Sequence, residues 1–168
     1  MQNVQITKVV RTKESVKIEF SSDEDRNGIT ETNGHKSVMK FVPHEDFALA
    51  FENLVFHLVK LSELEKNPVK GENDNFVVDG ISISSKSQFS GVKILGHKEL
   101  SDGRIVGIVA PFTALDEESS TYTFISDLIE AVETLESEAV QYLEGKHAMG
   151  GTQLKLADDY HTEKQEAA

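Results

Sequence analysis

The chain has 168 residues, of which 29 are acidic and 17 are lysine or arginine, so its formal charge is −12. This length favours one compact domain, and the lack of cysteine excludes disulfide scaffolds, thiolate metal sites and cysteine nucleophiles. No apolar run approaches the roughly 18 residues of a membrane span, and the N-terminus lacks the charged-then-apolar order of a signal peptide. We therefore expect a cytoplasmic protein with no membrane partner.

The first part of the chain has the period-two pattern of β-strands. Apolar residues alternate with polar ones, which predicts strands with one buried face, at Val4 and Ile6 and again at Val16, Ile18 and Phe20. Residues 21–36 contain two Asn-Gly steps and predict a long loop or a hairpin extension. A third strand is expected at 37–42, and Pro43 marks its end.

Residues 44–65 predict a long amphipathic helix. Acidic Glu45 and Asp46 suit its N-terminal end. Apolar side chains spaced three and four residues apart form one stripe, whereas Leu49 and Phe56 fall on nearly the opposite side. A helix that is apolar on two sides needs a second apolar surface, so we expect Leu49 and Phe56 to lie in the interface of a homo-oligomer.

A second group of strands follows a polar linker at 66–75. Residues 76–84 predict a strand or a tight hairpin, and the strands at 92–100 and 104–112 flank a Ser-Asp-Gly turn. A second helix is expected from about Thr121 to Glu144, with Gly145 as its stop.

The element order is therefore β-β-β-α-β-β-β-α, which predicts an α+β fold. We expect a single domain over residues 1–145, in which two long amphipathic helices cover an antiparallel sheet of about six strands. Residues 146–168 have few apolar side chains and predict a flexible, acidic and polar tail.

Acidic residues are concentrated in the second helix and the linker before it. Between Ile105 and Gly145 there are nine acidic residues and no lysine or arginine. Asp127, Glu130 and Glu138 share one polar flank of the helix, and we expect this flank to bind a basic protein surface. The chain would then be a non-enzymatic interaction protein, for example an inhibitor that imitates the phosphates of DNA. Such a role would suit a viral or mobile-element accessory protein. The alternative is an acidic surface that only keeps the protein soluble.

The strand regions are basic by contrast, since residues 1–20 and 86–104 each carry a net charge of +2. This pattern supports an alternative function, in which the solvent-exposed face of the sheet binds single-stranded nucleic acid through Lys8, Lys17, Lys93 and Arg104. Phenylalanines could either stack on bases or pack in the core. The five phenylalanines in question are Phe20, Phe41, Phe76, Phe89 and Phe112.

Sequence motifs of catalysis are missing: the chain has no G-x-S-x-G, P-loop, G-x-G-x-x-G or H-E-x-x-H. We therefore expect neither an enzyme nor a cofactor. Asp23, Asp25, Asn27 and Gly28 match the first half of a calcium-binding loop, but Gly34 stands where the final glutamate belongs. We expect no metal site, and Asp23, Asp25 and Asn27 are the candidate ligands if one exists.

Overall fold

The computed structural model describes residues 3–86 and 89–148. Seven strands and three helices form an α+β fold, which confirms the predicted class. The elements are β1 (Asn3–Arg11), β2 (Val16–Arg26), β3 (Ile29–Met39), α1 (Glu45–Glu52), α2 (Val55–Leu61), β4 (Phe76–Lys86), β5 (Phe89–Glu99), β6 (Ile105–Val109), β7 (Thr113–Ala114) and α3 (Ile125–Leu143).

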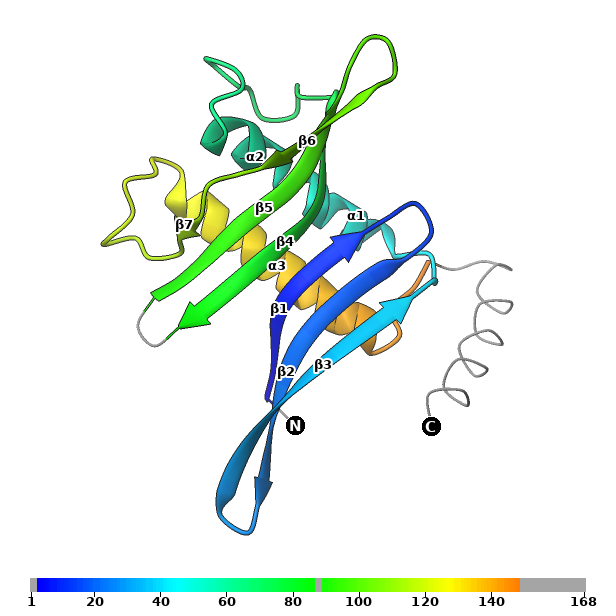
Figure 1. The fold of residues 1–168 in the computed structure, drawn as a ribbon, viewed down its shortest axis with the longest axis vertical. Coiled ribbons are helices and arrows are strands. Elements are labelled where there is room, and N and C mark those ends of the chain that lie inside the picture. Colours follow the sequence, from blue (N-terminus) through cyan, green and yellow to red (C-terminus); the bar gives the residue numbers. More distant parts are fainter. Residues whose placement is uncertain (1–2, 87–88, 149–168) are drawn as a thin grey trace.

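All seven strands belong to one antiparallel sheet with the spatial order β3-β2-β1-β4-β5-β6, and β7 also pairs with β5. The two groups of strands meet in the middle, where Lys8–Val10 of β1 pair with Gly80–Ser82 of β4. All three helices lie behind one face of the sheet in Figure 1, while no described element covers the other face. We call this uncovered side the open face.

Two turns predicted from the sequence are present. Asn27 and Gly28 have φ angles of 54° and 79°, as the two central residues of a type I′ hairpin turn require. Pairing continues up to Arg26 and Ile29, so residues 21–36 form a hairpin extension and the third strand begins eight residues earlier than predicted. At the other hairpin, Gly103 has a φ of 83° and its N–H donates to the Leu100 carbonyl at 2.9 Å.

The prediction of one long helix over 44–65 is wrong, because α1 and α2 are separate short helices. Between them the N–H of Leu54 donates a hydrogen bond to the Phe51 carbonyl at 3.1 Å. This spacing of three residues is that of a 3₁₀ turn, which is tighter than an α-helical turn. The break lets each half bury its own apolar side. Phe56 is thereby only 7% exposed and packs edge-on against Phe124, whereas Leu49 is 54% exposed. Phe56 finds its second surface within the chain, which removes the reason to place it in an oligomer interface.

Helix α3 spans 19 residues and ends where the sequence predicts. Gly145 has a φ of 108°, and the N–H groups of Gly145 and Lys146 donate to the carbonyls of Tyr142 and Gln141 at 3.1 and 2.9 Å. These two bonds form a Schellman motif, for which glycine is the favoured residue. Among the described residues, no helix is long and apolar enough to cross a membrane.

The first residues of the predicted tail pack against the domain. The ring of His147 stacks on that of Phe41 at 4.3 Å between centroids, and the N–H of Ala148 donates to the Val42 carbonyl at 2.9 Å. The remainder of the predicted tail, residues 149–168, lies outside the described residues.

Candidate functional site

The open face of the sheet brings together three of the four predicted basic residues. Side chains alternate between the two faces along a strand, and residues paired across strands share a face. Val9, Ile81 and Ile94 are fully buried beneath the helices. Their neighbours Lys8 and Lys93 therefore point to the open face, and Lys17, paired with Val10, does so too.

Lys8 and Lys93 belong to a polar row that crosses five strands. The row reads Lys36, Glu19, Lys8, Ser82 and Lys93. With strands spaced roughly 4.8 Å apart, the row is about 19 Å long. Lys36 was missed from the sequence because it lies in the stretch expected to be a loop. No described residue forms an ion pair with any of the three lysines, so their charges are available to an anionic partner.

Apolar side chains and one aromatic ring lie beside this row. A parallel row across the sheet holds Val38, Lys17, Val10, Gly80, Leu95 and Val109. Phe112 is 48% exposed and its ring occupies the space over Gly91, where a Cβ atom would come within 2.0 Å of the ring. Gly91 lies two residues before Lys93 on the same strand and face, so a stacking ring stands next to the lysine row.

The other rings and Arg104 are placed elsewhere. Phe76 is buried, Phe41 packs against the core, and Phe20 stacks on His35 on the side of the helices. The side chain of Phe89 lies outside the described residues. Arg104 is in the β5–β6 turn, where its Nε donates to Asp102 at 2.7 Å.

Two of the three acidic residues proposed to bind a basic protein are bonded to lysines of the same chain. Lys70 Nζ lies 2.6 Å from the carboxylate of Asp127, and Lys146 Nζ lies 2.9 Å from that of Glu138. Because Lys70 donates this hydrogen bond, the pKa of Asp127 falls below its usual value. Glu130 is exposed and has no side-chain partner among the described residues.

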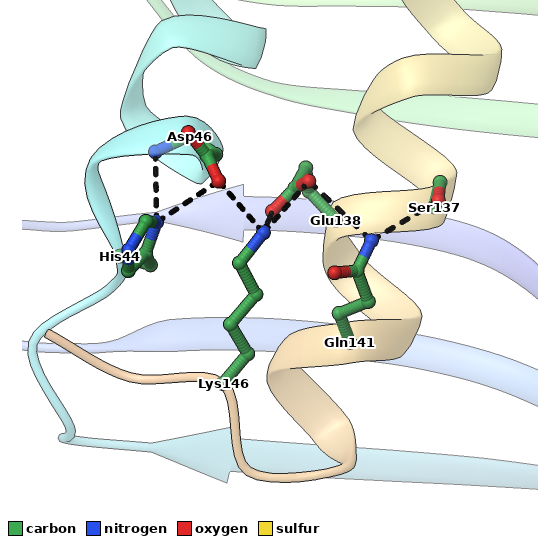
Figure 2. A network of polar contacts seen from close by, with 6 residues as sticks. All are labelled: His44, Asp46, Ser137, Glu138, Gln141 and Lys146. Atoms are coloured by element: carbon green, nitrogen blue, oxygen red, sulfur yellow. Dashed lines mark hydrogen bonds and ion pairs between the residues drawn. The ribbon is translucent and has the colours of Figure 1, made fainter.

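Glu138 is part of a polar network that ties the end of α3 to the start of α1 (Figure 2). Lys146 lies between two helices, donating to Glu138 and lying 2.8 Å from Asp46, while His44 contacts Asp46 at 3.1 Å. The side chain of Glu138 is only 12% exposed. Burial and pairing give Glu138 a structural role, and they leave its carboxylate little access to a partner.

A cleft of about 740 Å³ opens between α1, α2, α3 and the 66–75 loop, and the Lys70–Asp127 pair lies in its wall. Next to it, buried His57 makes a 2.9 Å hydrogen bond with the Tyr122 hydroxyl. Burial lowers the pKa of His57 to about 4 and raises the pKa of Tyr122 well above its usual range. Neither group changes charge near neutral pH, so this pair is poorly suited to acid–base catalysis there.

The candidate calcium ligands lie on the β2–β3 hairpin. Asp23 and Asp25 belong to the extended strand β2, and each accepts a 2.6 Å hydrogen bond from a threonine of β3. Asn27 forms the turn. Within the described part of the chain no group of three or more histidine and acidic side chains is arranged to hold a metal ion.

Comparison with known proteins gives no match: no family model, no curated protein and no solved structure is significantly similar to this chain.

Replacing Lys70 by methionine will raise the pKa of Asp127 toward its ordinary value, because the hydrogen bond that favours its ionised form is removed. An NMR titration of the Asp127 carboxyl carbon measures the change, and Asp116, whose low pKa depends on Ser119 and on backbone N–H groups, is the internal control. An unchanged Asp127 titration would show that Lys70 does not hold this carboxylate in solution.

Proposed function

We propose that the protein is a non-enzymatic binding module whose open sheet face binds single-stranded nucleic acid. The observation that carries this proposal is the row of three lysines without ion-pair partners among the described residues, Lys36, Lys8 and Lys93, with the exposed ring of Phe112 at its end. Proteins that bind single strands without sequence preference combine such a basic track with rings on which bases stack.

The net charge of −12 does not contradict this proposal, because nine acidic residues and no lysine or arginine lie between Ile105 and Gly145, in α3 and the segments before it. Helix α3 lies behind the sheet in Figure 1, whereas the register and burial of the strands place the lysine row on the open face. At physiological ionic strength exposed charges are screened over roughly 8 Å, which is comparable to the thickness of one packed layer. Locally, the row holds three lysines and one glutamate, Glu19.

Fluorescence anisotropy with a labelled oligothymidine of about 20 nucleotides tests the proposal. We expect uptake at about 50 mM salt and a steep loss of affinity at about 200 mM. The double variant Lys8→Gln/Lys93→Gln removes two phosphate contacts, so we expect on the order of 50-fold weaker binding at about 50 mM salt and a salt slope about 1.4 smaller.

A matched control has the same charge change at other exposed lysines. Lys13 lies in the β1–β2 turn and Lys66 in the polar linker, and Lys13→Gln/Lys66→Gln should retain most of the affinity. The proposal fails if the wild-type protein takes up no oligonucleotide at low salt, or if the two double variants weaken binding equally.

A second candidate function is binding of a basic protein to the acidic flank of α3. Glu130 of this flank is exposed and has no ion-pair partner among the described residues, and the same holds for Glu133 elsewhere on α3 and for Glu144 at its C-cap. If this function holds, the wild-type protein binds a fluorescent oligolysine and does not bind the oligothymidine. The double variant Glu130→Gln/Glu133→Gln then loses its affinity for the oligolysine. Uptake of the oligothymidine alone would exclude it.

A further inference from the structure

The two edges of the sheet differ in how well they are protected from other strands. Natural edge strands are blunted by charged or polar side chains, because their free N–H and C=O groups can pair with another chain. The edge strand β3 carries Glu31, His35 and Lys36 over its 11 residues. The opposite edge strand, β6, reads Ile-Val-Gly-Ile-Val and has no charged or polar side chain. Ile105 and Val109 are each 65% exposed, and Val106 is 49% exposed.

The free hydrogen-bonding groups of β6 belong to alternate residues. At the two ends of its ladder with β5, Leu100 N–H donates to the Arg104 carbonyl at 2.8 Å and Ala110 N–H donates to the Ile94 carbonyl at 2.9 Å. Hydrogen-bonded pairs alternate in an antiparallel ladder. The even-numbered residues of β6 therefore bond to β5, and the N–H and C=O groups of Ile105, Gly107 and Val109 point outward.

We propose that β6 pairs with β6 of a second copy of this chain, antiparallel and centred on Gly107. In this register Gly107 meets the partner's Gly107, and Ile105 meets the partner's Val109. Each outward N–H and C=O then faces an outward group of the partner, so six hydrogen bonds close between the strands. The sequence suits this symmetry, because each β-branched side chain is opposite another, Ile105 to Val109 and Val106 to Ile108.

The charge distribution also fits a second copy. Two molecules of charge −12 repel each other, but β6 lies in a stretch, Ile105–Leu115, that contains no charged residue. The twofold axis of such a pair is perpendicular to the sheet, so both open faces lie on the same side. This inference does not depend on the proposed function, and it is tested without nucleic acid.

Sedimentation equilibrium of the full chain over a wide concentration range tests the pairing. We expect the wild-type mass to rise from 18.6 kDa toward twice that value. Gly107→Lys places two like charges directly opposite each other in the pair, so we expect about a 100-fold weaker association. A Cβ atom at Gly107 meets nothing within 4 Å, and the monomer should fold normally.

Gly34→Lys is the matched control. Gly34 lies on the open face of the other edge strand, and a Cβ atom there also meets nothing within 4 Å. This variant has the same charge as Gly107→Lys and should associate like the wild type. Hydrogen exchange gives a second measurement: the amides of Ile105, Gly107 and Val109 should become protected with rising concentration, while those of Val106 and Ile108 are protected throughout. A wild-type protein that stays monomeric at high concentration, or equal association of the two lysine variants, would overturn the proposal.

Discussion

Replacing Leu135 by alanine will lower the free energy of unfolding by about 3 to 4 kcal/mol, the usual cost of removing a buried leucine side chain and leaving a cavity. Leu135 is fully buried on the side of α3 that packs against the sheet and α1. Because the long helix spans the face of both strand groups (Figure 1), a cavity beneath it weakens the whole domain. Urea unfolding followed by circular dichroism measures the change.

Thr134→Ala is the control for this prediction. Thr134 is the preceding residue on the same helix, but it is exposed and its hydroxyl bonds to the Glu130 carbonyl within the helix. We expect its free energy of unfolding to change by less than about 0.5 kcal/mol. If Leu135→Ala were as stable as Thr134→Ala, the described packing of α3 would be incorrect.

Acidification from neutral pH to about pH 4.5 will cost about 2 to 3 kcal/mol of stability through His57. Burial holds the pKa of this histidine at about 4 in the folded protein, whereas the unfolded chain has the ordinary value of about 6.5. Below pH 6.5 the unfolded state binds a proton that the folded state does not. The contribution of His57 is therefore fully present above pH 6.5 and is lost progressively as the pH falls toward 4.

The His57→Gln variant isolates this contribution from other titrating groups, such as His147, whose pKa burial also lowers. Glutamine can still hydrogen bond to Tyr122 but does not titrate. We expect the stability of the variant, measured by urea unfolding at several pH values, to fall by about 2 to 3 kcal/mol less than that of the wild type. Identical pH profiles would mean that His57 is not held neutral.

The local features of the fold could be predicted from the sequence because neighbouring residues determine them. The Asn27–Gly28 and Ser101–Gly103 turns need residues that tolerate positive φ, and the chain supplies glycine at both. The end of α3 follows from Gly145 for the same reason. Alternation along β2 predicted that Lys17 points away from the buried side of Val16 and Ile18, as it does. Lys8 could not be placed in this way, because a β-bulge between Ile6 and Lys8 shifts the alternation of β1.

Features that depend on distant parts of the chain could not be predicted. Lys70 and Asp127 are 57 positions apart, and no local pattern indicates that they pair. The expectation that the acidic flank of α3 is free was therefore mistaken for Asp127 and Glu138. The break at Leu54 also has a tertiary cause, since α1 and α2 bury different sides.

The central claim, that the open face of the sheet binds a single-stranded nucleic acid, is tested most directly by an NMR titration of the full chain with an oligothymidine at low salt. The account predicts saturable shifts of the amides of Lys8, Ser82 and Lys93 on the open face. It also predicts that the amides of Glu130 and Glu133 on α3 do not move. Shifts confined to α3, or no saturable shift on the open face, would contradict it.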